Sequence, residues 1–166
     1  MVKLDDIEIR DSLEPGDIGH ILHLHGLIYS RENGYGFPFE AYVAEGLAEF
    51  LRWYDASRDR VWICAHEGHI AGTLLLMHRD ADAAQLRYFL IDPRYRGIGL
   101  GGKLMECFLR RLRECGYATS YLWTTSEQAA AITLYTKYGF RLTEEKMSTT
   151  LGRSVLEQRY ELSERR

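Results

Sequence analysis

Residues 92–103 read Asp-Pro-Arg-Tyr-Arg-Gly-Ile-Gly-Leu-Gly-Gly-Lys, and this stretch decides the fold. It holds four glycines within six positions, and an amphipathic helical pattern follows directly. Glycine destabilises a helix interior, so this run of glycines needs a reason. A helix N-terminus offers unpaired N–H donors and the positive end of a dipole, and glycine lets a ligand approach those donors closely. With Arg96 and Lys103 adding charge, the stretch predicts a cradle for a pyrophosphate.

Two other nucleotide motifs fit this stretch less well. Gly97, Gly99 and Gly102 satisfy the G-x-G-x-x-G spacing of dinucleotide-binding folds. That motif also needs an acidic residue about 20 positions on, at the end of the next strand. The next predicted strand reads Thr-Ser-Tyr-Leu-Trp-Thr-Thr and has no acid, and no Gly-Lys-Ser/Thr sequence gives a phosphate loop of the Walker type.

Hydrophobic periodicity on both sides of the glycine stretch predicts an alternation of strands and helices. Helices are predicted after residues 14–17, then over 39–54, from 100 to about 115 and over 127–138, with a loop at 31–38. Strands are predicted at 5–10, 60–66, 69–78, 85–92, 119–125, 140–147 and 154–162. This order predicts an α/β fold in which a mixed central sheet carries helices on both faces.

Length, charge and cysteine content narrow the class of protein. The 166 residues predict one domain spanning 1–166. A formal net charge of −3 gives no general attraction for nucleic acid or an anionic membrane, so we expect neither as a partner. An odd number of cysteines, three, argues against a disulfide framework and for a reducing compartment. No apolar run reaches membrane-spanning length, and the N-terminus does not resemble a signal peptide. We therefore expect a cytoplasmic protein.

Two separated segments resemble one known family. Arg96-x-x-Gly99-x-Gly101 lies within LIDPRYRGIGLGGKLM directly after a predicted strand, and AAITLYTKYGF covers residues 130–140. Both segments resemble the GNAT superfamily of N-acetyltransferases. The aromatic N-terminal helices, the run LRYFLIDPRYRGIGLG and the ending LGRSVLEQRYEL together resemble one branch of this family, which occurs alone or fused to MarR-type regulators. Many members have an asparagine early in the second segment, where this chain has Gln128 or Thr125.

The resemblance implies a GNAT-type sheet that is splayed between its fourth and fifth strands, and acetyl-CoA as the acetyl donor. It implies that backbone amides of the glycine stretch hold the pyrophosphate and that an amide near Leu90 or Ile91 holds the thioester oxygen. The residues that it assigns to acetyl-CoA are Leu90, Ile91, Arg96, Gly97, Ile98, Gly99, Leu100, Gly101, Gly102 and Lys103.

The resemblance also assigns Tyr135 the role of general acid that protonates the departing thiolate. Helical spacing alone favours a core position for this side chain, and the family position favours the acid. The general base stays open between bound water and four residues, namely Glu32, Glu40, His25 and His78. No cysteine or carboxylate completes a ligand set with the histidines at 20, 23 and 25, so we expect no metal.

In this family the acceptor lies against the loop between the first two helices. Here that loop supplies Tyr29, Tyr35 and Phe37 as expected substrate-binding residues, although aromatic side chains there could equally cover the edge of the core. Arg87 is a further expected substrate-binding residue, and with Arg31 it could bind a carboxylate. Strand alternation puts Arg87 on the face of Phe89, opposite Leu86 and Tyr88.

Together these features predict an acetyl-CoA-dependent N-acetyltransferase that acts on a small amine or amino acid by direct attack. Two alternatives are a non-catalytic acyl-CoA-binding sensor and an acetyltransferase of protein lysines or N-termini. An interaction or DNA-associated regulatory domain is a further alternative, and it would require a basic face. A homodimer is a possible assembly.

Overall fold

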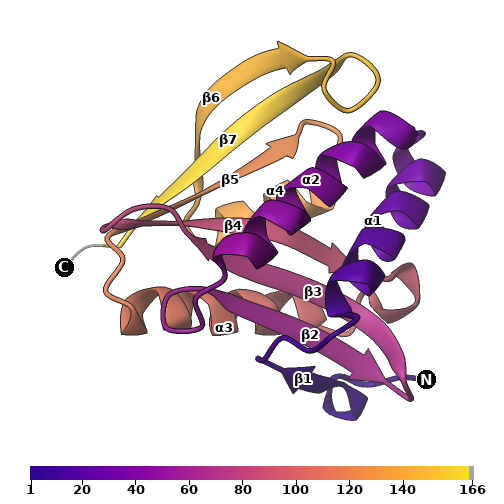
Figure 1. The fold of residues 1–166 in the computed structure, drawn as a ribbon, viewed down its shortest axis with the longest axis vertical. Coiled ribbons are helices and arrows are strands. Elements are labelled where there is room, and N and C mark those ends of the chain that lie inside the picture. The colour runs from indigo at the N-terminus through magenta and orange to yellow at the C-terminus, as the bar shows by residue number, and fades with distance from the viewer. Residues whose placement is uncertain (165–166) are drawn as a thin grey trace.

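A seven-stranded mixed sheet forms the centre of the protein in the computed structural model, which describes residues 1–164 (Figure 1). Its strands lie in the order β1-β2-β3-β4-β5-β7-β6. The strands are β1 (Glu8–Arg10), β2 (Arg60–His66), β3 (His69–His78), β4 (Ala83–Ile91), β5 (Thr119–Thr125), β6 (Arg141–Ser148) and β7 (Val155–Ser163). The α-helices are α1 (Asp17–Asn33), α2 (Phe37–Trp53), α3 (Leu100–Glu114) and α4 (Ala129–Lys137).

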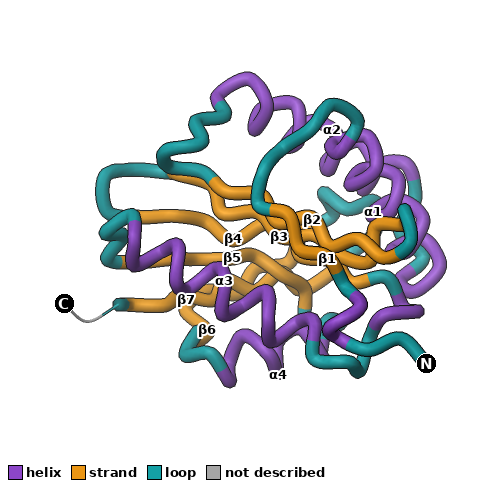
Figure 2. The backbone as a smooth tube through the Cα atoms, turned by 90° about the horizontal axis from the view of Figure 1, so that it is seen from below, coloured by secondary structure: helices purple, strands orange, loops and turns teal. Residues whose placement is uncertain are grey.

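The helices cover both faces of this sheet. Figure 2 shows α1 and α2 on one face and α3 and α4 on the other. Each face has its own cluster of buried apolar side chains, one under α1 and α2 and one under α3 and α4. The predicted α/β fold with helices on both faces is therefore confirmed.

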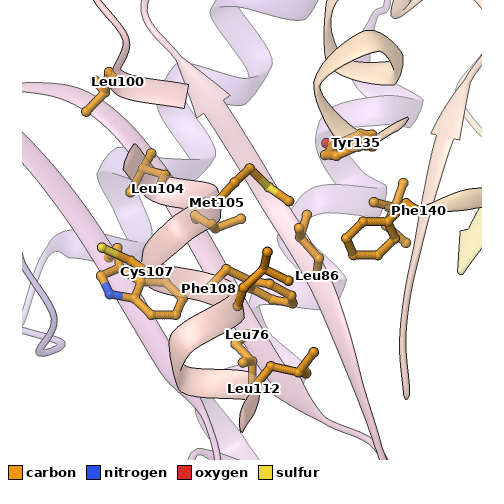
Figure 3. Packing of buried hydrophobic residues seen from close by; sticks show 14 of the residues in the cluster. Leu76, Leu86, Leu100, Leu104, Met105, Cys107, Phe108, Leu112, Tyr135 and Phe140 are labelled. Carbon is orange, nitrogen blue, oxygen red and sulfur yellow. The ribbon is translucent and has the colours of Figure 1, made fainter. Parts of the chain in front are cut away.

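The amphipathic pattern that follows the glycines packs α3 onto the sheet. Leu104, Phe108 and Leu112 recur every four residues, and none of them has measurable exposure. They lie against sheet residues such as Leu76 and Leu86 (Figure 3). Burying one such side chain stabilises the fold by roughly 1.5–3 kcal/mol, so this stripe anchors the helix whose N-terminus the glycines form.

The loop predicted at 31–38 is shorter in the structure. Helix α1 continues to Asn33 and α2 begins at Phe37, which leaves only Gly34–Gly36 between them. Gly34 has a φ of +67° and ends α1 as a left-handed cap, and Pro38 fits the first turn of α2, where no N–H partner is needed. The prediction was wrong because polar and aromatic residues of this segment occupy helix ends.

The remaining predicted boundaries agree with the structure to within a few residues. The first strand is the exception, since residues 4–6 form a 3₁₀ turn and only Glu8–Arg10 pairs with β2. Within residues 1–164, no helix is both long enough and apolar enough to cross a membrane.

Candidate active site

The sheet splits between β4 and β5. These parallel strands pair only where Ala83–Gln85 faces Thr119–Tyr121. Beyond this point β4 continues to Ile91 and β5 to Thr125, and no ladder joins them in the described chain. The splay predicted between the fourth and fifth strands is confirmed. It leaves one edge of β4 with backbone groups that a polar ligand can pair with.

A β-bulge at Tyr88 marks this split. The β3–β4 register shifts between Thr73 and Leu75, and Tyr88 has a φ of +51°. The Thr73 hydroxyl donates to the Tyr88 carbonyl oxygen at 2.8 Å and holds the bulge in place. The extra residue turns Tyr88 toward α2 and Phe89 toward α3. The predicted alternation was therefore wrong at this point, because a bulge interrupts the two-residue period.

The glycine stretch presents a row of free backbone donors. Gly97 and Gly99 have φ values of +78° and +91°, a region that glycine enters without strain. Within residues 1–164, the N–H groups of residues 97–102 donate to no protein acceptor, and Lys103 is the first to do so, to the Gly99 carbonyl at 3.1 Å. Consecutive unpaired N–H groups at a helix N-terminus fit the diphosphate of a coenzyme A thioester.

Arg96 of this stretch already binds other protein groups. Arg96 donates from Nε to the Ile91 carbonyl at 3.1 Å and from its two terminal nitrogens to Glu32 at 2.8 and 3.1 Å. Lys103 is exposed. The free donors of this turn are therefore backbone groups, and Glu32 partly neutralises the charge of Arg96.

A cavity of about 340 Å³ lies on the α1–α2 side of the split. It brings together four of the residues assigned to catalysis or substrate binding, Tyr29, Tyr35, Arg87 and Tyr135. His25, Thr125 and Gln128, which the sequence analysis also named, line it as well. Phe37 does not join them, since it stands at the start of α2 with 86% of its surface exposed. Arg31 lines a different groove, beside the β2–β3 turn. The expectation that Arg31 and Arg87 bind one carboxylate together is therefore wrong.

Tyr135 lies both in the core and at the edge of the cavity. Its ring centroid lies 6.1 Å from those of Phe89 and Phe140, so the ring is part of the core under α4 (Figure 3). The same side chain also lines the cavity. Burial, and secondly the Tyr29 phenol, raise the pKa of Tyr135, which keeps its phenol protonated and able to donate.

Three stacked rings form one wall of the cavity. His25 and Tyr29 are four residues apart on α1, and their rings stack at 5.9 Å. The ring of Tyr35 continues the stack, 5.9 Å from Tyr29. Burial raises the pKa of Tyr29 to about 12, so its hydroxyl stays neutral. The ring faces of this wall are apolar, and the hydroxyl and imidazole groups at the ring edges are polar, a combination that is common in small-molecule sites.

Among the four candidate bases, only His25 lines the cavity. Its Nδ1 lies 2.8 Å from the Ile21 carbonyl oxygen, which can only accept, so Nδ1 carries the proton and Nε2 keeps a lone pair. Burial lowers the pKa of His25 to about 4, and the Arg87 charge acts in the same direction. The imidazole is therefore neutral at neutral pH.

The other three candidates have different surroundings. Glu32 is paired with Arg96, and Glu40 is an exposed residue of α2 that does not line the cavity. Nδ1 of His78 lies 2.8 Å from the Tyr117 hydroxyl, at the end of β3 and β4 opposite the glycine turn.

A polar network that the sequence did not reveal ties three loops together at the cavity. Arg153, between β6 and β7, donates to the Asn33 carbonyl at 3.0 Å and to Glu127 at 2.5 Å. The Tyr35 hydroxyl donates to Glu127 at 2.8 Å, and the Arg153 guanidinium lies 5.1 Å from the Tyr35 ring centroid. No motif marks Arg153 or Glu127, because their partners are distant in sequence.

Known proteins share parts of this sequence. Residues 27–140 match the acetyltransferase (GNAT) family. An uncharacterized N-acetyltransferase of Escherichia coli K12, YjgM, is 31% identical over 97 residues, which are 57% of this chain and 58% of that protein. The chain spans 58–59% of the length of the curated relatives that it matches over long stretches.

Solved structures share the fold. A spermidine N-acetyltransferase from Vibrio cholerae, in complex with CoA and spermine, superposes with a TM-score of 0.71 at 20% identity and covers 96% of both chains. A putative acetyltransferase from Salmonella typhimurium, yncA, with its cofactor acetyl-CoA, gives a TM-score of 0.71 at 19% identity and covers 95% of this chain and 94% of that one.

Proposed function

The chain belongs to the GNAT acetyltransferase family, and on that premise we propose that it transfers the acetyl group of acetyl-CoA to the nitrogen of a small amine or amino acid. One observation carries the proposal. The sheet splits between β4 and β5, a cavity that Tyr135 lines lies along the split, and a row of free backbone donors follows the end of β4.

The donor side is formed by main-chain groups. The N–H groups of Gly97 to Gly102 bind the diphosphate, and the open edge of β4 at Leu90 and Ile91 pairs with the amide-containing arm. Bound acetyl-CoA supplies a thioester whose carbonyl carbon takes the amine nitrogen and whose sulfur leaves as a thiolate. An N–H at Leu90 or Ile91 that faces the carbonyl oxygen stabilises the charge developing there by about 3 kcal/mol.

Tyr135 then donates its phenolic proton to the leaving sulfur. A raised pKa makes the phenol a weaker acid, but the same desolvated cavity also makes the thiolate a stronger base. The proton therefore moves between two groups whose affinities are raised together. Water returns a proton to Tyr135 after the products leave.

The acceptor side is the cavity wall of Tyr29, Tyr35 and Arg87. His25 accepts a hydrogen bond from the amine through Nε2. The proton that the acceptor ammonium loses passes to water, because His25, with a pKa of about 4, cannot retain it at neutral pH. The chain thus mainly aligns two reactants, an effect that is worth several kcal/mol by itself, about 7–11 in the best-aligned cases.

The test compares Tyr135→Phe with Tyr117→Phe, a buried phenol that does not line the cavity. In a screen of amines that follows released thiol, Tyr135→Phe is expected to lower kcat by about 100-fold or more. Calorimetric binding of CoA should change by less than about twofold in either variant. Full turnover in Tyr135→Phe would remove the acid from the proposal. Tight CoA binding without turnover of any amine would favour the sensor alternative.

A further inference from the structure

Arg87 stands in the cavity without a carboxylate partner. Its guanidinium lies 4.6 Å from the ring centroid of Tyr88 and 5.7 Å from that of Tyr42, and a terminal nitrogen donates to the Tyr42 hydroxyl at 3.5 Å. Among residues 1–164, no Asp or Glu forms an ion pair with it. A partly buried guanidinium that contacts two aromatic rings and one hydroxyl has donors left for an anion.

The hydroxyl of Tyr88 is also unsatisfied. Only 8% of this residue is exposed, and its oxygen has no hydrogen-bond partner in the described chain. A buried hydroxyl without a partner costs free energy, and such groups are rare in folded proteins. Tyr88 lines the same cavity as Arg87, and its hydroxyl lies under α2 next to Gly46.

A glycine in the middle of α2 makes room for both side chains. A Cβ on Gly46 would overlap the Tyr88 hydroxyl and come within 3.0 Å of the Arg87 guanidinium. Glycine inside a helix lowers its stability, so the room made for these two side chains has a cost. Gly46 places the hydroxyl of Tyr88 and the guanidinium of Arg87 side by side under α2.

The remaining charges of the cavity leave it positive. Besides Arg87, the charged residues that line it within residues 1–164 are Lys146 and Glu157, and these two pair with each other at 3.6 Å. His25 is neutral, as its lowered pKa indicates. The net positive charge suits an anionic group and disfavours a polyamine.

From these contacts we propose that Arg87 and Tyr88 form a carboxylate subsite and that the acceptor is an amino carboxylate, an amino acid in its simplest form. The guanidinium binds the carboxylate through two N–H groups, and the Tyr88 hydroxyl donates to one of its oxygens. The subsite rests on the proposed acetyl transfer and names its acceptor class. Gly46, Tyr88 and Arg87 together decide specificity, while Tyr135 serves the chemistry.

The first experiment uses matched acceptors. The twenty amino acids, their carboxamides and their decarboxylated amines are screened with the full chain and acetyl-CoA. We expect kcat/KM for the best amino acid to exceed that of its carboxamide and its amine by about 50-fold or more. Equal turnover of carboxamides or amines would overturn the subsite and leave the acetyl transfer intact. Turnover of no compound at all would overturn both.

The second experiment uses variants with a readout besides activity. Arg87→Met is expected to weaken binding of the best amino acid to the CoA-loaded protein by about 20-fold or more, while Arg113→Met on the outer face of α3 leaves it unchanged. Tyr88→Phe should raise Tm, because it removes the unsatisfied hydroxyl, and yet weaken amino-acid binding about fivefold. A purely structural role would move Tm alone, and that result would remove Tyr88 from the subsite.

Discussion

Arg96 of the glycine turn and Glu32 near the end of α1 form a two-pronged ion pair, with nitrogen–oxygen distances of 2.8 and 3.1 Å. The pair joins the proposed diphosphate cradle to the helix that carries Tyr29 and His25. Both partners are well exposed, so the pair adds little to stability. Its main consequence is electrostatic, because Glu32 offsets the charge that Arg96 brings to the cradle.

Glu32→Gln is therefore expected to tighten CoA binding by about two- to fivefold at low salt, as the net positive charge near the diphosphate rises. Titration calorimetry at two salt concentrations measures the change, which salt should reduce. Glu40→Gln removes an exposed carboxylate of α2 outside the cavity and is the matched control. Weaker CoA binding in Glu32→Gln would instead mean that Glu32 is needed to hold Arg96 in a binding position.

The sequence predicts most of this architecture because periodic patterns report local structure directly. The stripe of Leu104, Phe108 and Leu112 predicts α3, and glycines that need positive φ predict the turn before it. The sequence also indicates Tyr135 and Arg87 as site residues. Tyr135 lies in a motif, and Arg87 is a charged residue within an apolar strand. Each of these signals lies within one element.

Features that depend on several elements could not be predicted in the same way. The bulge at Tyr88 depends on the hydroxyl of Thr73 in the neighbouring strand, and no local residue type demands it. Arg153 and Glu127 meet only after three loops fold together. Phe37 looked like a wall residue because aromatic neighbours surround it in sequence, but the early start of α2 turns it to solvent.

His25 is expected to make stability depend on pH. Its pKa is about 4 in the folded protein and 6.5 for an unperturbed histidine, so between these values the unfolded chain binds the extra proton. Stability should therefore fall as the pH drops from about 6.5 to about 4, by at most about 3 kcal/mol from this residue. Chemical denaturation at several pH values measures this loss.

The comparison variant is His25→Asn, whose amide can still donate to the Ile21 carbonyl but does not titrate. The difference between its pH profile and that of the unchanged chain isolates the histidine from the carboxylates that titrate nearby in pH. His20→Asn, at an exposed position of the same helix, should leave the profile as it was. Parallel profiles for His25→Asn and the unchanged chain would contradict a neutral buried imidazole.

Gly99→Ala is expected to affect both stability and the cofactor site. Gly99 has a φ of +91° at the N-cap of α3, and a Cβ there costs roughly 1–2 kcal/mol. Relieving that strain would move the N–H groups of the cradle, so CoA binding should weaken by about fivefold or more. Gly68→Ala in the β2–β3 turn, where φ is +78°, should lose similar stability and keep CoA affinity. Equal CoA affinity in the two variants would mean that CoA binding does not depend on the conformation of Gly99.

Arg153→Ala is expected to loosen the acceptor wall without harming the donor site. Arg153 packs over the Tyr35 ring and binds the Glu127 carboxylate that also receives the Tyr35 hydroxyl, so its loss frees Tyr35 to change rotamer. Because the ion pair is partly exposed, its loss should change the stability of the fold little. The KM for the acceptor should rise about fivefold, and the KM for acetyl-CoA should stay unchanged. Arg110→Ala, at an exposed position of α3, is the control and should change neither KM. A fall in kcat at constant acceptor KM would show that the network serves the chemical step instead.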